Sequence, residues 1–180
     1  MDIKTERLTL RRLVPEDASW VAQGISEPSV HRWLPAVPFP YQITYADQFI
    51  ARSGDLAGVR AVVKAGEPLG VVSLVPRDSA DQSQRVSGAG LGYWLKESAW
   101  GKGYMTEAAL GLLSWHFDNS DQMVISGWVE GNVGSEKVLD KLGFRRTGQR
   151  PERDSLFLRE KVRVIEVVLS KDQAPTAQQP

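Results

Sequence analysis

The sequence contains no cysteine and only two histidines, His31 and His116. Without thiols, the chain can form no disulfide and no thiolate metal site, and it offers no cysteine nucleophile. Two histidines are too few for a histidine-rich metal centre. We therefore predict that the protein binds no metal.

The sequence also lacks an excess of either charge and any long apolar run. Lys and Arg together number 22, as do Asp and Glu, so the formal net charge is zero. A neutral chain without a basic run does not favour nucleic acid as a partner. No apolar stretch reaches the roughly 18 residues needed to span a membrane, and the N-terminal MDIKTERLTL lacks the layout of a signal peptide. We expect a cytoplasmic protein with no membrane or nucleic-acid partner.

The chain of 180 residues has room for one domain with a substantial core. The predicted elements, in chain order, are a strand at 6–13, a helix from Pro15, a helical turn at 29–33, a helix capped by Thr44, strands at 59–64, 69–75 and 88–95, a helix from Tyr104, a strand at 123–128, a helix from Asn132 or Gly134, and strands at 144–147 and 163–169. This order predicts an α/β (α+β) fold with helices on both faces of a mixed, mostly antiparallel sheet of about seven strands, in one domain over residues 1–170. Residues 76–88 are predicted to form a loop, and residues 171–180 a disordered tail.

One stretch, Tyr93–Ala109, combines a buried strand, a loop with Gly101 and Gly103, and a helix that begins near Tyr104. The first N–H groups of a helix have no partner within the helix, and the helix dipole adds positive charge at the same point. Such a helix start can bind a phosphate or a diphosphate. A simple corner between a strand and a helix is the alternative interpretation, because many α/β proteins turn the chain in this way.

Four motifs in the right order extend this pattern along nearly the whole chain. They are TERLTLRRLVPEDA (5–18), GYWL (92–95) followed by WGKGYMTEA (100–108), EGNVGS (130–135) and KLGF (141–144). Together they resemble the GNAT N-acetyltransferases, and within that superfamily the branch of the ribosomal-protein N-terminal acetyltransferases (RimJ/RimL-like). The resemblance implies a GNAT fold in which two central parallel strands splay apart, and it implies acetyl-CoA as co-substrate.

The resemblance also implies where the acetyl-CoA binds. Exposed backbone groups near Leu95–Glu97 would bind the pantetheine and the thioester, the loop after Trp100 would bind the diphosphate, and Asn132 would anchor the pantetheine chain. The residues implied in acetyl-CoA binding are Leu95, Lys96, Glu97, Gly101, Lys102, Gly103, Tyr104, Met105, Thr106, Asn132, Ser135 and Lys137.

The catalytic residues are less clear from the sequence, because the chain departs from the family pattern. Gly90 stands where many members have a glutamate that acts as the base, and Leu139 replaces a tyrosine that often acts as the acid. Ser135 takes the position of a serine near the CoA sulfur, so we predict that it protonates the thiolate or donates a hydrogen bond to it. Glu130 is the predicted base.

Glu97 and His31 are further candidates for the base, and a chain of water molecules is another. An exposed carboxylate is more often a solvated surface group than a catalyst. Met105 stands where glycine or alanine is usual, so its side chain could narrow the diphosphate loop.

The acceptor is predicted to be a primary amine, either on a peptide N-terminus or on a small molecule. Four residues near the proline-rich segment are predicted to bind it: His31, Trp33, Phe39 and Tyr41. Core packing or a subunit contact is the alternative role for these aromatic residues. A homodimer is a further option, since members of the family often form dimers.

Two other functions fit parts of the sequence. Gly101–Thr106 reads G-x-G-x-x-T, which resembles a dinucleotide-binding loop without its third glycine, but it follows several strands instead of opening the domain. A non-catalytic acyl-CoA sensor on the same fold is the other alternative, because Gly90 removes the usual base.

Overall fold

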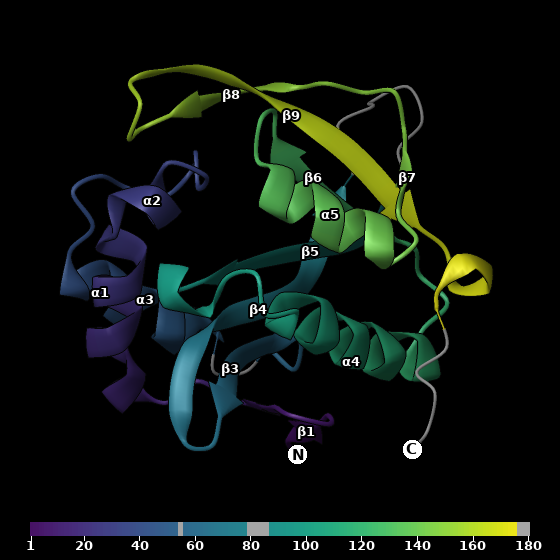
Figure 1. Ribbon diagram of the computed structural model, residues 1–180, viewed down its shortest axis with the longest axis horizontal. Helices are drawn as coiled ribbons and strands as arrows, with labels where there is room; N and C mark the ends of the chain where they lie inside the picture. The colour runs from purple at the N-terminus through teal and green to yellow at the C-terminus, as the bar shows by residue number, and fades with distance from the viewer. Residues whose placement is uncertain (54–55, 79–86, 176–180) are drawn as a thin grey trace.

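The computed structural model describes residues 1–53, 56–78 and 87–175 (Figure 1). The strands are β1 (Ile3–Lys4), β2 (Thr9–Arg11), β3 (Val59–Lys64), β4 (Glu67–Asp78), β5 (Ser87–Leu95), β6 (Val124–Val129), β7 (Arg145–Arg146), β8 (Glu152–Ser155) and β9 (Glu160–Leu169). The helices are α1 (Ala18–Ser26), α2 (Pro28–His31), α3 (Ile43–Ser53), α4 (Tyr104–Asn119) and α5 (Val133–Lys141), with 3-10 turns η1 (Pro15–Asp17), η2 (Glu97–Ala99) and η3 (Lys171–Gln173). The strands form one sheet in the order β1-β2-β3-β4-β5-β6-β9-β7, with β8 paired to β9. No helix within the described residues is both long and apolar enough to cross a bilayer.

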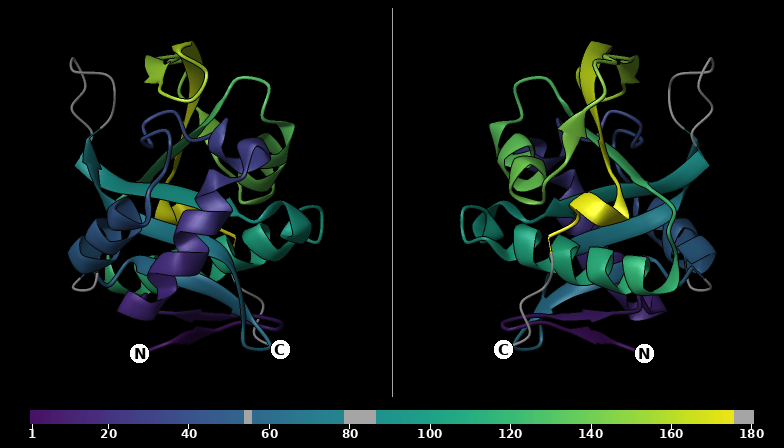
Figure 2. Two further views of the ribbon diagram at one scale, coloured as in Figure 1. Left: turned by 90° about the vertical axis from the view of Figure 1, so that its left-hand side faces the viewer. Right: turned by 90° about the vertical axis from the view of Figure 1, so that its right-hand side faces the viewer.

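Each face of the sheet carries its own buried cluster, because side chains alternate along the strands. On one face Val72 and Leu91 pack with Leu112 of α4 and Leu139 of α5. On the opposite face the cluster joins sheet residues to α1 and α3, and its members include Val21, Ile25, Ile50, Ala61 and Val71. Helices therefore cover both faces (Figure 2), as the sequence predicts.

The two central parallel strands separate after a short contact. β5 and β6 pair only at Ala89 with Val124 and at Gly90 with Ile125. Beyond this point the Ser126 hydroxyl donates a 2.9 Å hydrogen bond to the Leu91 carbonyl, in place of a further ladder bond. β5 meanwhile stays paired to β4 as far as Leu95. The predicted splay is thus confirmed, and it leaves a fork between β5 and β6.

Within the described residues the sheet has nine strands, whereas the sequence predicted about seven. β1 is only two residues long, and β8 is a polar segment, ERDS, so neither carries an alternating apolar pattern. The predicted loop at 76–88 is shorter, because β4 extends to Asp78 and β5 begins at Ser87. Residues 79–86 of that loop lie outside the described residues. α3 begins at Ile43, so Thr44 lies inside the helix and is not its cap.

The predicted disordered tail begins with an ordered turn. Lys171–Gln173 form η3, where the Lys171 ammonium lies 2.8 Å from a carboxylate oxygen of Asp121. Ala174 packs against the core cluster beneath α4. These contacts order the first residues of the segment that was predicted, from its polar composition alone, to be a disordered tail. Residues 176–180 lie outside the described residues.

The carboxylate of Glu107 joins the N-terminal segment to the first turn of α4. One of its oxygens accepts hydrogen bonds from the Thr5 hydroxyl at 2.6 Å and from the Arg7 main-chain N–H at 2.7 Å. The other oxygen accepts from Arg7 Nε at 2.7 Å. Arg7 also donates to the Lys102 carbonyl at 3.2 Å, so this contact reaches the loop that precedes α4. The TER segment and the TEA segment of the sequence are therefore structurally linked.

Replacing Glu107 with Gln should lower the free energy of unfolding by about 1–3 kcal/mol, the usual range for hydrogen bonds to a charged group. Burial raises the pKa of Glu107, but the hydrogen bonds from Thr5 and Arg7 outweigh it and leave the pKa below its usual value. Because the pKa of Glu107 is lower in the folded protein, its carboxylate stabilises the fold fully above about pH 4.3, the ordinary pKa of glutamate. This stabilisation is lost as the pH falls through the lowered pKa of the folded state.

Urea unfolding at pH 7 and at pH 3 tests this, with Glu6→Gln as the control for an exposed neighbour that has no such contacts. The difference between wild type and Glu107→Gln should be large at pH 7 and should shrink at pH 3. An equal difference at both pH values would show that the carboxylate charge is not responsible.

Candidate active site

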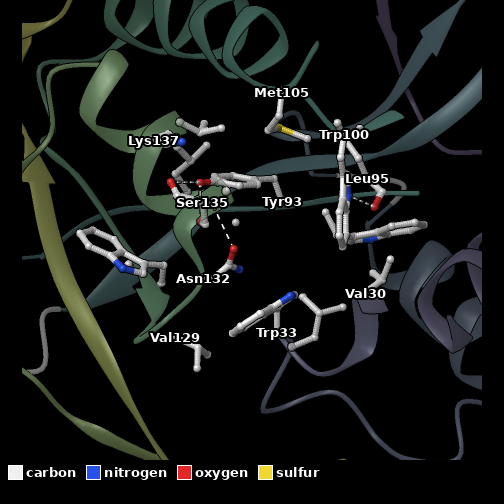
Figure 3. Close-up of a pocket in the computed structure, with 18 of the residues that line it drawn as sticks. Val30, Trp33, Tyr93, Leu95, Trp100, Met105, Val129, Asn132, Ser135 and Lys137 are labelled. Atoms are coloured by element: carbon white, nitrogen blue, oxygen red, sulfur yellow. Dashed lines mark hydrogen bonds between the residues drawn. The ribbon is translucent and has the colours of Figure 1, made fainter. Parts of the chain in front are cut away.

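A cavity of about 900 Å³ lies at the fork between β5 and β6 (Figure 3). Its walls come from β5, from the loop before α4, from the β6–α5 corner, and from the segment that follows α2. These are the ends of elements that the sheet brings together from distant parts of the chain. Ligand sites are commonly concave, largely apolar spaces of this size with a few polar groups.

The structure brings a large part of the predicted site together at this cavity. The predicted residues that line it are Trp33, Leu95, Gly101, Gly103, Tyr104, Met105, Thr106, Asn132, Ser135 and Lys137. The predicted residues outside its lining are His31, Phe39, Tyr41, Lys96, Glu97, Lys102 and Glu130. The residues predicted from the glycine loop and from the EGNVGS motif are thus mainly inside, whereas most of the predicted acceptor residues are not.

Main-chain groups of β5 point alternately toward β4 and toward the fork. The Lys96 N–H donates to the Leu69 carbonyl at 2.8 Å, so Lys96 faces β4. The Leu91 carbonyl faces β6, and by the same alternation the main-chain groups of Tyr93 and Leu95 face the fork. The Leu95 carbonyl accepts a 2.8 Å hydrogen bond from the Trp100 indole. The N–H groups of Tyr93 and Leu95 therefore point toward the cavity.

Lys96 and Glu97 were expected to offer backbone groups to acetyl-CoA, but their N–H groups point elsewhere. That of Lys96 belongs to the ladder with β4, and that of Glu97 donates to the Glu27 carboxylate at 3.3 Å. Only Leu95 among these three residues directs its N–H into the fork.

The loop before α4 has the conformation that its glycines allow. Gly101 and Gly103 have φ angles of 72° and 78°, in the left-handed region that favours glycine, and Gly103 is the N-cap of α4. A Cβ atom added at Gly101 would meet no atom within 4 Å. The backbone there is open to an approaching group, and the following N–H groups of α4 are suited to a diphosphate.

The Lys102 side chain turns away from the opening, whereas Met105, in the first turn of α4, lines the cavity. The Lys102 ammonium donates to the Ser98 carbonyl at 2.8 Å. Met105 is 5% exposed and belongs to the core cluster beneath α4, so most of its surface lies in protein contacts.

A chain of hydrogen bonds links β5 to the start of α5. Asn132 is the N-cap of α5, and its side-chain oxygen accepts from the Ser135 N–H at 3.1 Å. The Ser135 hydroxyl lies 2.7 Å from the Tyr93 hydroxyl, across the fork (Figure 3). Burial raises the pKa of Tyr93, and the hydrogen bond with Ser135 lowers it only in part. Tyr93 is therefore a neutral phenol in the physiological range and can donate a proton in a hydrogen bond.

Tyr93 is the residue that the sequence reasoning missed as part of the site. The GYWL motif contains it, but we assigned no role to its hydroxyl. Its position two residues before Leu95 puts both on the same face of β5, and this alternation was the available signal.

The predicted base Glu130 does not face the cavity. Its carboxylate pairs with Arg150 at 3.5 Å and with Arg163 at 3.7 Å, and its side chain is 47% exposed. Glu97 accepts a 2.6 Å hydrogen bond from the Ser29 hydroxyl, also outside the cavity lining. Both carboxylates therefore bind surface groups, which agrees with the alternative interpretation that they are solvated surface residues and not catalysts.

His31 is fully buried, and its ring stacks on Phe157 with centroids 5.3 Å apart. Its Nε2 lies 3.2 Å from the Val37 carbonyl. The rings of Phe39 and Tyr41 lie around it at centroid distances of 5.3 and 6.5 Å. Much of the predicted acceptor cluster thus packs on itself, while Trp33 alone of the four lines the main cavity.

The position that carries a glutamate in many relatives is occupied differently here. A Cβ atom added at Gly90 would lie 2.8 Å from Cδ of Arg77 and 2.9 Å from its Cβ. The Arg77 side chain therefore covers Gly90, and Arg77 also lines the cavity. A cationic side chain takes the space that an acidic side chain at position 90 would need. No cluster of three or more His, Asp or Glu side chains that could hold a metal occurs within the described residues.

The fold and the site define an α/β protein with a forked parallel strand pair and a glycine loop at a helix start beside the fork cavity. Residues 7–145 match the family described as "Acetyltransferase (GNAT) domain". The chain is also 32% identical over 149 residues to "Uncharacterized N-acetyltransferase p20" of Bacillus licheniformis, covering 80% of this chain and 82% of the relative. The protein belongs to the GNAT family of N-acetyltransferases.

Solved structures share the fold at lower identity. "Mycobacterium smegmatis RimJ in complex with CoA-disulfide" has a TM-score of 0.75 and 17% identity, covering 94% of this chain and 85% of that chain. The "Ribosomal-protein-S5-alanine Acetyltransferase from Vibrio fischeri" has a TM-score of 0.70 and 20% identity, covering 97% and 100%. At these identities the likeness concerns the fold alone.

Replacing Gly101 with Ala should weaken acetyl-CoA binding by roughly tenfold, which corresponds to about 1.4 kcal/mol. The added methyl group would stand on the open side of the loop where the diphosphate is expected. The residue would also pay about 1–2 kcal/mol for its left-handed conformation.

Gly66→Ala is the matched control, because Gly66 also has a positive φ, 86°, with no atom within 4 Å of an added Cβ. Calorimetric titration with acetyl-CoA and urea unfolding of both variants separate the two effects. Both variants should lose stability, and only Gly101→Ala should lose affinity. Unchanged affinity in Gly101→Ala would remove this loop from the binding site.

Proposed function

We propose that the protein is an acetyl-CoA-dependent N-acetyltransferase that moves an acetyl group to a primary amine, on a small molecule or a peptide N-terminus, by direct attack on the thioester. The observation that carries this proposal is the fork cavity, which has Tyr93 and Ser135 on one side and the open Gly101 loop on another. Family membership supports acetyl transfer in general, and the mechanism and the acceptor are our proposal.

The residues present fit acetyl-CoA. The N–H groups of Gly101–Thr106 would bind the diphosphate, the fork-facing N–H groups of Tyr93 and Leu95 would bind the pantetheine arm, and Asn132 would contact the same arm. When bound, acetyl-CoA supplies an activated acyl group on a thiol leaving group. An N–H donor aimed at the thioester oxygen would stabilise the negative charge that develops there.

Ser135 and Tyr93 are suited to the departing sulfur. The amine nitrogen forms a bond to the acetyl carbon, the carbon–sulfur bond breaks, and its electron pair stays on sulfur. One proton must leave nitrogen and one must reach sulfur. If the Tyr93 hydroxyl is the donor in its hydrogen bond with Ser135 Oγ, the Ser135 hydroxyl is free to donate its own hydrogen bond toward the sulfur. The phenol then holds the serine in that orientation.

Deprotonation of the amine needs no strong base if the acceptor has a low pKa. Nothing in the described cavity lining is a carboxylate, and Glu130 and Glu97 lie outside it. The α-amino group of a peptide N-terminus has an unperturbed pKa of about 7.7–8.0, so a substantial fraction is already neutral near pH 7.5. Placement of the two reactants can then provide much of the rate enhancement.

The proposed function is tested by thermal unfolding with acetyl-CoA or NAD, followed by mass spectrometry of a mixed library of amines and peptides. Acetyl-CoA at one hundred times its Kd should stabilise the protein by about 2.7 kcal/mol, and NAD should not. Acetylated products should appear only with the enzyme present. Binding of acetyl-CoA without any product would favour a sensor, and stabilisation by NAD alone would favour a dinucleotide-binding module.

The variants Ser135→Ala and Tyr93→Phe test the proposed roles of these hydroxyl groups. Ser135→Ala should lower kcat by about a hundredfold or less, because a thiol of pKa near 8.5 leaves without much assistance. Tyr93→Phe should lower kcat by a smaller factor, since it removes only the group that orients Ser135.

Steady-state kinetics should show little change in KM for acetyl-CoA in either variant, and the exposed Ser98→Ala serves as control. Complete loss of activity in Ser135→Ala with unchanged acetyl-CoA binding would mean that the serine has a larger role. A full rate in both variants would remove the pair from the mechanism.

A further inference from the structure

A second cavity of about 380 Å³ lies beside the fork cavity on the face of α1 and α3. Its walls are rich in aromatic residues, with Tyr41, Tyr45, Phe49 and Trp94 around it. The two cavities share lining residues, including Val37 and Gly92, so they lie side by side. A group held at the fork therefore lies next to a cavity with aromatic walls.

Gly92 lies where the two cavities meet. A Cβ atom added there would have one close contact, 3.3 Å to the Ser73 hydroxyl, so the absence of a side chain leaves space at the boundary of the two cavities. Ser73 and Gly92 both line the second cavity.

The charged residues that line the two cavities, among the residues the structure describes, are all cationic. They are Arg77, Lys137 and Lys141 in the fork cavity and Arg52 in the second. Lys137 and Lys141 lie on α5, beside the Ser135 side of the fork, whereas Arg77 lies on β4. Arg77 approaches Glu166 only to 4.0 Å, and a guanidinium has five N–H donors, so it can also bind a carboxylate.

The acceptor side of the fork cavity is bordered by two segments that contact each other. The Leu156 N–H donates to the Pro35 carbonyl at 3.2 Å, and Phe157 packs on Phe39 with ring centroids 4.8 Å apart. Pro35 of the first segment lines the cavity, as does Val164 of β9, the strand that follows the corner. This contact between the β8–β9 corner and the segment after α2 favours a small acceptor over a long peptide.

We propose that the acceptor is an aromatic α-amino acid, with its ring in the second cavity and its carboxylate on Arg77. This inference rests on the proposed function and names its substrate class. The aromatic walls match the ring, and the guanidinium of Arg77 matches the carboxylate. A polyamine would meet only positive charge and would stay protonated, with amine pKa values near that of lysine, about 10.4.

The experiment compares kcat/KM of the full chain, with saturating acetyl-CoA, for L-phenylalanine, L-tryptophan, 2-phenylethylamine, L-alanine, spermidine and a peptide with a free N-terminus. The two aromatic amino acids should exceed 2-phenylethylamine and L-alanine by roughly tenfold to a hundredfold, the range for losing a hydrogen bond to a charged group or an apolar contact. Preference for spermidine, for the peptide or for L-alanine overturns the inference, as does the absence of product from every amino acid.

Two pairs of variants locate the preference. Arg77→Met should bring the ratio of L-phenylalanine to 2-phenylethylamine close to one, while Arg153→Met, at an exposed arginine of β8, should leave it unchanged. Phe49→Ala should reduce the ratio of L-phenylalanine to L-alanine, while Ile43→Ala, at an exposed position of the same helix, should not. Both rates in a ratio are measured on one protein preparation, so partial misfolding of a variant does not change the ratio. Ratios that stay at the wild-type value in Arg77→Met and Phe49→Ala overturn the inference.

Calorimetric titration of acetyl-CoA separates the two levels of failure. If acetyl-CoA binds and another acceptor is acetylated, only the choice of acceptor is wrong. If acetyl-CoA does not bind, the proposed function fails and the inference fails with it.

Discussion

The separation of β5 from β6 after two paired residues is the constraint on which the site depends. Each strand keeps a full ladder on its outer side, β5 with β4 as far as Leu95 and β6 with β9 over Val124–Val129. The two strands can therefore diverge without losing their place in the sheet. The inner main-chain groups cannot stay unpaired in a dry core, because an unpaired buried polar group is costly. They border a cavity instead, and a ligand with its own amide groups can complete the ladder.

Side chains at either end of the fork keep this geometry in place. At the closed end, the Ser126 hydroxyl satisfies the Leu91 carbonyl where the ladder stops. Further along, the contact between Tyr93 and Ser135 ties β5 to α5 across the gap. Glu107 fixes the start of α4 to the N-terminal segment, which holds the glycine loop against the opening. The fork is thus supported by polar contacts from three separate parts of the chain.

The sequence predicted what local signals determine. The loop conformation follows from the glycines at 101 and 103, and the α5 cap follows from Asn132, because both depend on a few neighbouring residues. The resemblance carried by the four sequence motifs also predicted the fold as a whole. The environment of His31 could not be predicted in the same way, since it depends on Phe157, a residue far away in the sequence. Glu130 was assigned to the site from its place at a strand end, but its direction is decided by Arg150 and Arg163.

The exchange of charge at Gly90 is the feature that separates this site from the usual family pattern. Reading Gly90 in the sequence shows only that an acid is missing. The sheet register shows what replaces it, because Val75 pairs with Gly90 and Arg77, two residues on, projects from the same face of β4. The guanidinium lies 4.0 Å from the buried Glu166 carboxylate, so it has a charged partner within the protein and N–H donors left for a second carboxylate. A group that can bind the acceptor carboxylate thus stands where many family members have a base, and removal of the amine proton is left to water.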